Sequence, residues 1–315
     1  MEVHTDRNSS ARDIIREVGR VIAGKDAVIV KVLLAILAGG HILMEDIPGV
    51  GKTTLAVSMS RALGLDYNRV QFTPDVLPSD ITGYSLFDKN TGAMSYQRGA
   101  ILCNLFLADE LNRATSRTQS ALLQAMEEGE VTVDNHTYPV PRPFIVIATQ
   151  NPAGAKGTQL LPDSQLDRFM MRLTMGYPTH TDEIEMVRRR QSGISAESVR
   201  QIVTREELMG LQHEVEQVYV KDSIIDYIVT LCEKTRGNPH IQQGASPRAS
   251  LALTALAKAT AWMQKRDFVL PQDVRFSFYD CVEHRLIWKQ EVIDPASRAS
   301  VLNDIMKAVK APAIQ

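Results

Sequence analysis

The feature that most constrains the fold is a glycine-rich turn between an apolar strand and a helix. The segment from Ile42 to Thr54 reads ILMEDIPGVGKTT. Its two glycines can turn successive N–H groups inward, Lys52 can reach the β- and γ-phosphates of a nucleotide, and Thr53 can ligate Mg²⁺. The segment therefore predicts a P-loop, although the pattern G-x-x-x-x-G-K-[ST] would place its first glycine at Asp46.

Two adjacent carboxylates at the end of another apolar run supply the chemistry that a P-loop requires. The run from Leu105 to Ala108 is followed directly by Asp109 and Glu110. A carboxylate that ends a buried strand is typical of a Mg²⁺ ligand, and its neighbour can accept a proton from an attacking water. We therefore predict that Asp109 holds the metal and that Glu110 is the general base.

A third apolar run leads to a neutral amide. Residues Ile145 to Ala148 are followed, three positions later, by Asn151. Ligands of open α/β sheets bind at the carboxyl ends of the strands, so this amide is expected beside the same phosphates. We predict that Asn151 orients the water or contacts the γ-phosphate, with an ordinary Asn-Pro turn as the alternative.

Apolar and β-branched runs alternate with helical patterns in the first part of the chain. Two helices are expected over 11–22 and 26–37, and polar turns predict β-hairpins over 84–96 and 130–140. Five runs are expected as buried strands, over 42–44, 67–72, 104–108, 144–148 and 169–173. They predict an α/β fold whose doubly wound, parallel five-stranded sheet forms an αβα core.

After Pro178 the β pattern fades and the spacing of apolar residues becomes helical. Helices are expected over 182–191, 205–218, 222–234, 247–263 and 271–281. We therefore predict two domains, an αβα nucleotide-binding core over residues 1–180 and a smaller all-α domain over residues 181–315.

Composition and charge limit the partners and the compartment. The formal net charge is −2, so no overall basic field favours nucleic acid or an anionic membrane. The three cysteines lack a C-x-x-C spacing, and the N-terminal residues are polar where a signal peptide is apolar. The longest apolar run, over 32–44, is shorter than the ~20 residues that span a bilayer. We expect a cytoplasmic protein without a membrane segment.

The order and spacing of these motifs resemble the MoxR family of AAA+ ATPases over nearly the whole chain. The P-loop is joined by QFTPD from Gln71, PSDITG from Pro78, ADELNRA from Ala108, ATQNP from Ala148 and LDRF from Leu166. The resemblance implies an AAA+ core and a helical lid that bind ATP and Mg²⁺. It also implies a homo-oligomeric ring, often a hexamer, in which a neighbouring subunit completes each active site.

The P-loop pattern and the resemblance together predict the site residues. Asn151 matches the sensor-1 residue, Arg168 the arginine finger offered to the adjacent subunit, and Arg248 the sensor-2 residue directed at the phosphates, while Arg113 and Arg117 are further finger candidates. The alternatives are an ordinary ion pair of Arg168 with Asp163 or Asp167, and simple exposure of Arg248 in the first turn of its helix. Mg²⁺ is assigned to Thr53 and Asp109. The predicted ATP contacts are Val21, Ile22, Gly24, Pro48, Gly49, Val50, Gly51, Lys52, Thr53, Thr54 and Asp109.

The predicted function is Mg²⁺-dependent ATP hydrolysis by a chaperone-like motor that remodels or matures a client protein. The resemblance implies a partner with a von Willebrand factor A domain, and Phe87, Met94 and Tyr96 of the first hairpin are expected either to face the pore or a partner or to pack on the core. The alternatives are a magnesium-chelatase-like motor subunit and a nucleotide-gated assembly switch. A motor that acts on nucleic acid is disfavoured, because the tip of the second hairpin is not basic.

Overall fold

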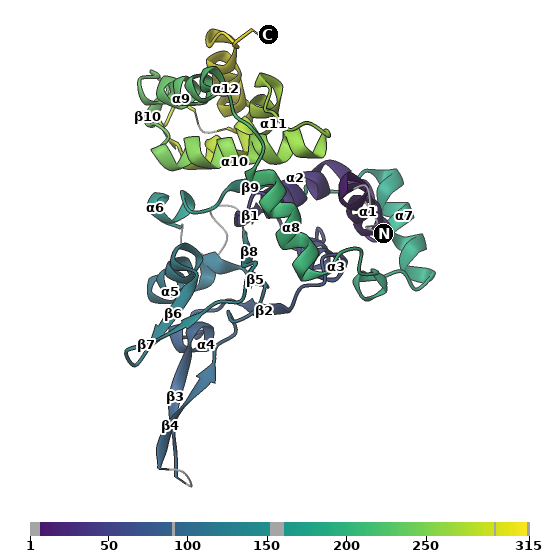
Figure 1. Cartoon of the computed structure of the whole chain (residues 1–315), viewed down its shortest axis with the longest axis vertical. Coiled ribbons are helices and arrows are strands. Elements are labelled where there is room, and N and C mark those ends of the chain that lie inside the picture. The colour runs from purple at the N-terminus through teal and green to yellow at the C-terminus, as the bar shows by residue number, and fades with distance from the viewer. Residues whose placement is uncertain (1–6, 90–91, 152–160, 293, 314–315) are drawn as a thin grey trace.

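The core is a five-stranded parallel sheet with the strand order β2-β5-β8-β1-β9 (Figure 1). The computed structural model describes residues 7–89, 92–151, 161–292 and 294–313. The strands confirm the five predicted runs, with ends shifted by at most two residues: β1 (Ile42–Glu45), β2 (Tyr67–Gln71), β5 (Leu105–Asp109), β8 (Ile145–Gln150) and β9 (Met171–Leu173).

Successive residues of the central strands face opposite sides of the sheet, and both sides are buried. Leu105 and Leu107 pack in the cluster that includes α1 (Arg7–Gly19), α2 (Asp26–Leu37) and α3 (Lys52–Ala62). Phe106 and Ala108 pack on the other side with α4 (Pro78–Thr82) and α5 (Ser116–Glu128). This coverage explains why the strands are continuously apolar, and it confirms the αβα core.

Both hairpins are present. The second comprises β6 (Glu130–Val133) and β7 (His136–Pro139). The first, β3 (Gly83–Asp88) with β4 (Ala93–Arg98), extends away from the core as a long ribbon (Figure 1), and positions 90 and 91 of its predicted turn lie outside the described residues. The Tyr96 ring stacks on Tyr138 with 3.8 Å between centroids. Phe87 and Met94 are 55% and 62% exposed. Of the three residues, therefore, only Tyr96 follows the alternative that they pack on the core.

A helical bundle follows the core and packs above it (Figure 1). Its helices are α9 (Asp222–Arg236), α10 (Pro247–Met263), α11 (Pro271–Val282) and α12 (Pro295–Ala308), while the preceding α8 (Arg205–Glu216) lies below α10 at the level of the sheet (Figure 1). A short ribbon of β10 (Ile241–Gln243) and β11 (Ile287–Trp288) was not predicted, and neither was α12, which buries only Leu302 and Ile305 and therefore carries a weak apolar period.

One predicted helix of the second domain lies elsewhere. Helix α7 (His180–Gln191) contains no buried residue and lies beside α1, away from the bundle of α9 to α12 (Figure 1). The domain boundary at residue 181 therefore stays a prediction. The remaining short elements are α6 (Asp163–Leu166) and the 3-10 turns η1 (Leu111–Arg113), η2 (Ala196–Ser198) and η3 (Glu283–Arg285). Within the described residues, the helices are too short or too polar to cross a membrane.

The sheet contributes strongly to stability through its doubly buried strands. Phe106 is fully buried, so Phe106→Ala is expected to lower the free energy of unfolding by about 3–5 kcal/mol, because the large side chain leaves a cavity. Chemical denaturation monitored by circular dichroism measures the change. Leu251→Ala is the matched control, since Leu251 is 73% exposed and should change stability by less than about 0.5 kcal/mol. Equal effects of the two substitutions would contradict the assigned core.

Candidate active site

The P-loop joins the end of β1 to the start of α3. Gly49 and Gly51 have φ values of +86° and +100°, in the left-handed region that glycine tolerates best. Gly51 is the N-cap of α3, so the unpaired N–H groups of the first helical turn border the loop. This conformation is the anion cradle that the two glycines predict.

Lys52 is buried at the base of the cradle. Its Nζ donates to the carbonyl oxygens of Asp46, at 2.7 Å, and Ile47, at 2.9 Å. Burial lowers the pKa of Lys52, and the negative charges of Asp46, Asp109 and Glu110 oppose that shift. The ammonium group therefore holds the loop while lying among the residues predicted to handle the phosphates and the metal.

Asp46, which occupies the position of the missing glycine, has a structural role of its own. One carboxylate oxygen accepts from the backbone N–H of Met175, at 2.6 Å, and of Gly176, at 2.7 Å, and the other accepts from Ile47 at 3.0 Å. Three N–H donors satisfy a buried carboxylate well. Asp46 thus ties the P-loop to the segment that follows β9, a contact that no local sequence pattern indicates.

A cleft with a volume of about 790 Å³ opens beside the P-loop. One wall comprises most of the predicted ATP contacts, namely Val21, Ile22, Pro48, Gly49, Val50, Gly51, Thr53 and Thr54. The other wall includes Glu183, Met186 and Val187 of α7, which sequence reasoning did not assign to the site. The apolar residues on both walls suit a purine ring, and the cradle lies at the phosphate end.

Gly24 differs from the other predicted contacts because it does not line this cleft. It packs against α7, where a Cβ would lie 2.2 Å from the Cγ of Asp182. The adjacent Lys25 lines the cleft instead, and its Nζ donates to the carbonyl oxygens of Met175 and Tyr177, at 2.6 and 2.9 Å. Gly24 therefore allows close packing of the cleft wall.

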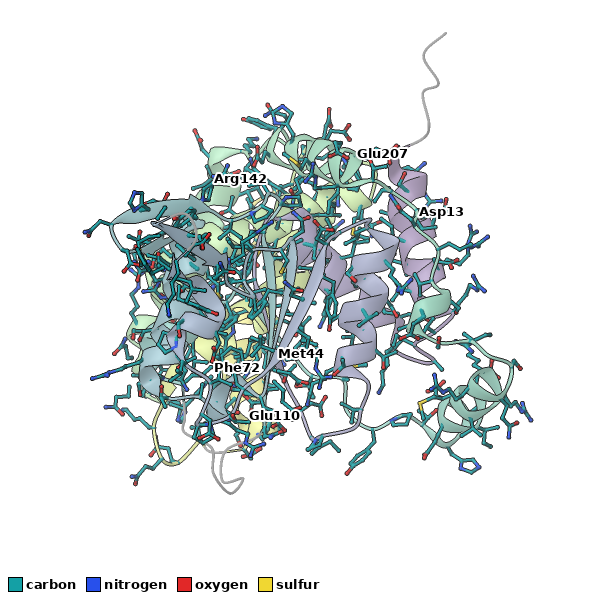
Figure 2. All side chains as sticks on the ribbon, turned by 90° about the horizontal axis from the view of Figure 1, so that it is seen from below. Asp13, Met44, Phe72, Glu110, Arg142 and Glu207 are labelled. Atoms are coloured by element: carbon teal, nitrogen blue, oxygen red, sulfur yellow. The ribbon has the colours of Figure 1, made fainter. Side chains whose placement is uncertain are left out.

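The three strand ends converge as the parallel sheet requires, and Figure 2 shows Met44, Phe72 and Glu110 at the same end of the strands. The Thr149 hydroxyl donates to Asp109 at 2.7 Å and accepts from the backbone N–H of Glu110 at 2.8 Å. The second carboxylate oxygen of Asp109 accepts from Arg69 Nε, at 3.1 Å, and Nη2, at 2.7 Å. Arg69 therefore belongs to the site. Sequence reasoning missed it, because nothing in the local pattern of β2 indicates its contact with Asp109.

Glu110 and Asn151 meet at the same edge. Asn151 Nδ2 donates to one carboxylate oxygen of Glu110 at 3.3 Å, and Arg113 donates to the other at 2.7 Å. The bond from Arg113 is the main reason why the pKa of Glu110 lies below its usual value. Glu110 is therefore ionised at neutral pH, the form that a general base requires.

The two predicted phosphate-directed arginines lie together, away from the cleft. Arg168 and Arg248 each form an ion pair with Glu127 in the last turn of α5. The hydrogen bond from Arg248 is the main cause that lowers the pKa of Glu127. Neither arginine lines the cleft of its own chain, and the α5 and α6 side of the sheet faces away from α7 (Figure 1). We call Arg168 and Arg248 the arginine pair.

The other finger candidates are placed differently. Arg113 is engaged by Glu110 of the same chain, whereas Arg117 is exposed at the start of α5. The alternative ion pairs of Arg168 with Asp163 or Asp167 are not formed, since Arg168 bonds to Glu127 and to the Leu123 carbonyl, at 3.2 Å.

The chemistry of this edge fits a magnesium-bound nucleoside triphosphate. The cradle offers glycine backbone without Cβ atoms, and Thr53 and Asp109 offer the hard oxygen ligands that Mg²⁺ prefers. Bound there, the ion would neutralise phosphate charge. A parallel sheet, a P-loop, paired carboxylates and a helical lid define an AAA+ ATPase.

Comparison with known proteins identifies the family. Residues 41–171 match the ATPase family associated with various cellular activities (AAA), and residues 233–305 match an AAA lid domain. The chain is 42% identical to the uncharacterized protein YeaC of Bacillus subtilis, over 95% of this chain and 93% of that protein. It is 36% identical to the chaperone MoxR1 of Mycobacterium tuberculosis, over 99% of this chain and 84% of that protein.

A solved structure agrees with these relatives. The crystal structure of a candidate ATPase from Cytophaga hutchinsonii superposes with a TM-score of 0.90 at 36% identity, covering 98% of this chain and 96% of that one. The chain belongs to the MoxR family of AAA+ ATPases.

The cradle makes a direct prediction about nucleotide affinity. Lys52→Ala removes the buried ammonium group, so we expect ATP to bind about 10- to 100-fold more weakly, the equivalent of one or two charge-assisted hydrogen bonds. Isothermal titration calorimetry measures the affinity. Lys310→Ala, which changes an exposed lysine at the far end of the chain, should bind ATP normally. Unchanged affinity in Lys52→Ala would refute the assigned cradle.

Proposed function

We propose that this chain hydrolyses Mg²⁺-bound ATP within a homo-oligomeric ring, in which the arginine pair of one subunit completes the cleft of the next. The observation that carries this proposal is the separation of the arginine pair from the cleft of its own chain. Contacts between two different faces of identical subunits are heterologous, and they close into rings when the rotation permits. A hexamer is the ring size that we propose from the family resemblance.

Within each site we assign the steps to residues of the P-loop and of the adjacent strand ends. Asp109 and Thr53 hold Mg²⁺, and Lys52 binds the phosphates. Glu110 accepts the proton of the attacking water, while Asn151, which donates to Glu110 at 3.3 Å, keeps the water and the carboxylate aligned. The arginine pair of the neighbouring subunit stabilises the charge that develops on the transferred phosphoryl group.

We further propose that the motor acts on a client protein in the cytoplasm, as a chaperone with a von Willebrand factor A-domain partner. The name of one relative, chaperone MoxR1, supports this class of activity. Phe87 and Met94, which are exposed cross-strand partners on the projecting β3–β4 ribbon, supply an apolar surface suited to a protein client.

If Glu110 is the general base, its loss should slow ATP hydrolysis without weakening ATP binding. Glu110→Gln keeps the shape of the side chain but removes its basicity, so we expect ATP affinity within about threefold of the unmodified chain and a turnover number reduced by about 10²–10⁴. Fluorescent-nucleotide titration and phosphate release measure the two quantities. Glu128→Gln, an exposed change in α5, should alter neither. Undiminished hydrolysis by Glu110→Gln would remove Glu110 as the base.

Shared sites predict that activity depends on assembly. The rate per subunit should rise with protein concentration, and Arg168→Ala should lower it by about 10³–10⁵, as for arginine fingers of other NTPases. Arg205→Ala, which changes an exposed arginine of α8 paired with Glu206, should keep the full rate. A rate that is independent of concentration and insensitive to Arg168→Ala would favour the nucleotide-gated switch instead.

A further inference from the structure

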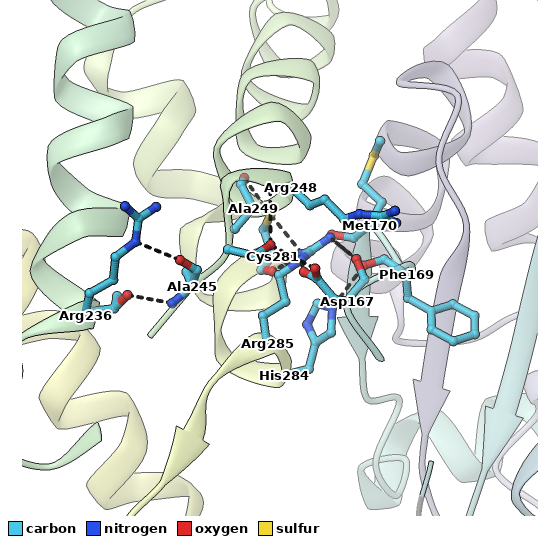
Figure 3. A network of polar contacts seen from close by, with 12 residues as sticks. Asp167, Phe169, Met170, Arg236, Ala245, Arg248, Ala249, Cys281, His284 and Arg285 are labelled. Atoms are coloured by element: carbon cyan, nitrogen blue, oxygen red, sulfur yellow. Dashed lines mark hydrogen bonds and ion pairs between the residues drawn. The ribbon is translucent and has the colours of Figure 1, made fainter. Parts of the chain in front are cut away.

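A polar cluster, in which His284 and Arg285 are buried, joins the lid to the segment that carries Arg168. It consists of Asp167, Ser246, His284 and Arg285, which we call the lid–core cluster (Figure 3). Its members come from the loop before β9, from the N-cap of α10 and from η3. The cluster therefore joins the segment that carries Arg168 to the lid helix that carries Arg248.

Arg285 makes most of the contacts in this cluster. Its side chain is only 2% exposed, yet its Nε donates to the Asp167 carboxylate at 3.0 Å. Its Nη2 donates to the carbonyl oxygen of Phe169 at 2.7 Å, and its Nη1 donates to that of Met170 at 3.2 Å. His284 adds a 3.0 Å bond to the same Phe169 carbonyl. One rigid guanidinium thus fixes the backbone on both sides of Arg168.

The same cluster also positions Arg248. The second carboxylate oxygen of Asp167 accepts from the Ser246 hydroxyl at 2.8 Å. Ser246 is the N-cap of α10, and Arg248 lies two residues further, in the first turn of that helix. Asp167 therefore links the segment of Arg168 to the helix of Arg248, while Arg285 holds Asp167 in place.

The turn that carries Arg285 is fixed from a second direction. Glu283 forms ion pairs with Arg172 of β9 and, at 3.1 Å, with Arg298 of α12. Arg172 also reaches Glu45 at the end of β1, at 3.2 Å. Because β9 and the lid helices both hold η3, Arg285 has little freedom to move relative to the sheet.

We propose that Arg285 is a positioning residue that sets the spacing of Arg168 and Arg248 for the nucleotide in the neighbouring subunit. This inference rests on the proposed function, since it assumes that the arginine pair acts on another chain. A buried ion pair is weak support for stability, because well-packed apolar residues often replace it at little cost. Its directional contacts do determine geometry, and a displacement of about 1 Å at a catalytic group can lower a rate about 100-fold.

The first test compares two arginines of the lid that each pair with an aspartate. Arg285→Met is expected to lower the turnover number by about 10- to 100-fold while the KM for ATP stays within about threefold, because the cleft of the same chain is untouched. Arg266→Met is the matched control: Arg266 pairs with buried Asp273 at 2.6 Å, and within the described residues none of its hydrogen bonds or ion pairs reaches residues 167–170. Normal turnover in Arg285→Met, or an equal loss in both variants, would overturn the inference.

The second test mixes subunits in one ring. Glu110→Gln subunits lack a working base but retain an intact arginine pair, so they should restore hydrolysis to Arg168→Ala subunits in mixed rings. If Arg285 acts through the arginine pair, they should restore Arg285→Met subunits to a similar extent. Rescue of Arg168→Ala without rescue of Arg285→Met would overturn this inference alone. Failure to rescue Arg168→Ala would instead overturn the shared site of the proposed function.

The proposal can also be tested if Arg285→Met does not fold. Thermal unfolding shows whether Arg285→Met is folded at the assay temperature. If it is not, Asp167→Asn carries both measurements, because it keeps the shape of the Arg285 partner but loses the charge that holds the guanidinium. We expect Asp167→Asn to give the same results as Arg285→Met: a loss of turnover, an unchanged KM, and rescue by Glu110→Gln subunits. The outcomes that would overturn the proposal are also the same.

Discussion

The parallel pairing of β1, β5 and β8 is the constraint on which the active site depends. Register places Glu45 beside Gln150 and Ala108 beside Ala148, so the P-loop, the paired carboxylates and Asn151 all begin at one edge of the sheet. Thr149 then joins Asp109 to the backbone of Glu110. A register shift of one residue would turn each side chain to the opposite face and separate these groups.

The sequence predicted the parts of the structure that local patterns specify. The five strands are found where runs of apolar residues indicate them, and α10 is found where apolar residues recur at helical spacing. The pairing partners of charged residues were not predictable, because Asp46 meets Met175 across 129 positions and Arg69 meets Asp109 across 40. Such contacts follow from the assembled sheet rather than from propensity. The family resemblance assigned Arg248 to the sensor-2 position, but it did not indicate the ion pair of Arg248 with Glu127.

Charged groups of the site are held by partners within the chain. Lys52 binds the loop carbonyls, Asp109 binds Arg69, and Glu110 binds Arg113. In the proposed function a magnesium-bound triphosphate would compete with some of these bonds, and part of its binding free energy would go into rearranging them. Such an exchange would give the nucleotide a physical means to move the P-loop, the strand ends and the segment that Asp46 ties to the loop.

The β3–β4 ribbon has a gradient of stability along its length. Its base is fixed by the Tyr96–Tyr138 stack and by the Tyr96 hydroxyl, which donates to the Thr82 carbonyl at 2.5 Å. Further out, an isolated pair of strands is only marginally stable in water, and the exposed Phe87 and Met94 add little packing. The outer ribbon can therefore change shape on contact with another surface while its base stays fixed to α4 and to β7. The ribbon is thus deformable at its outer end and rigid at its base.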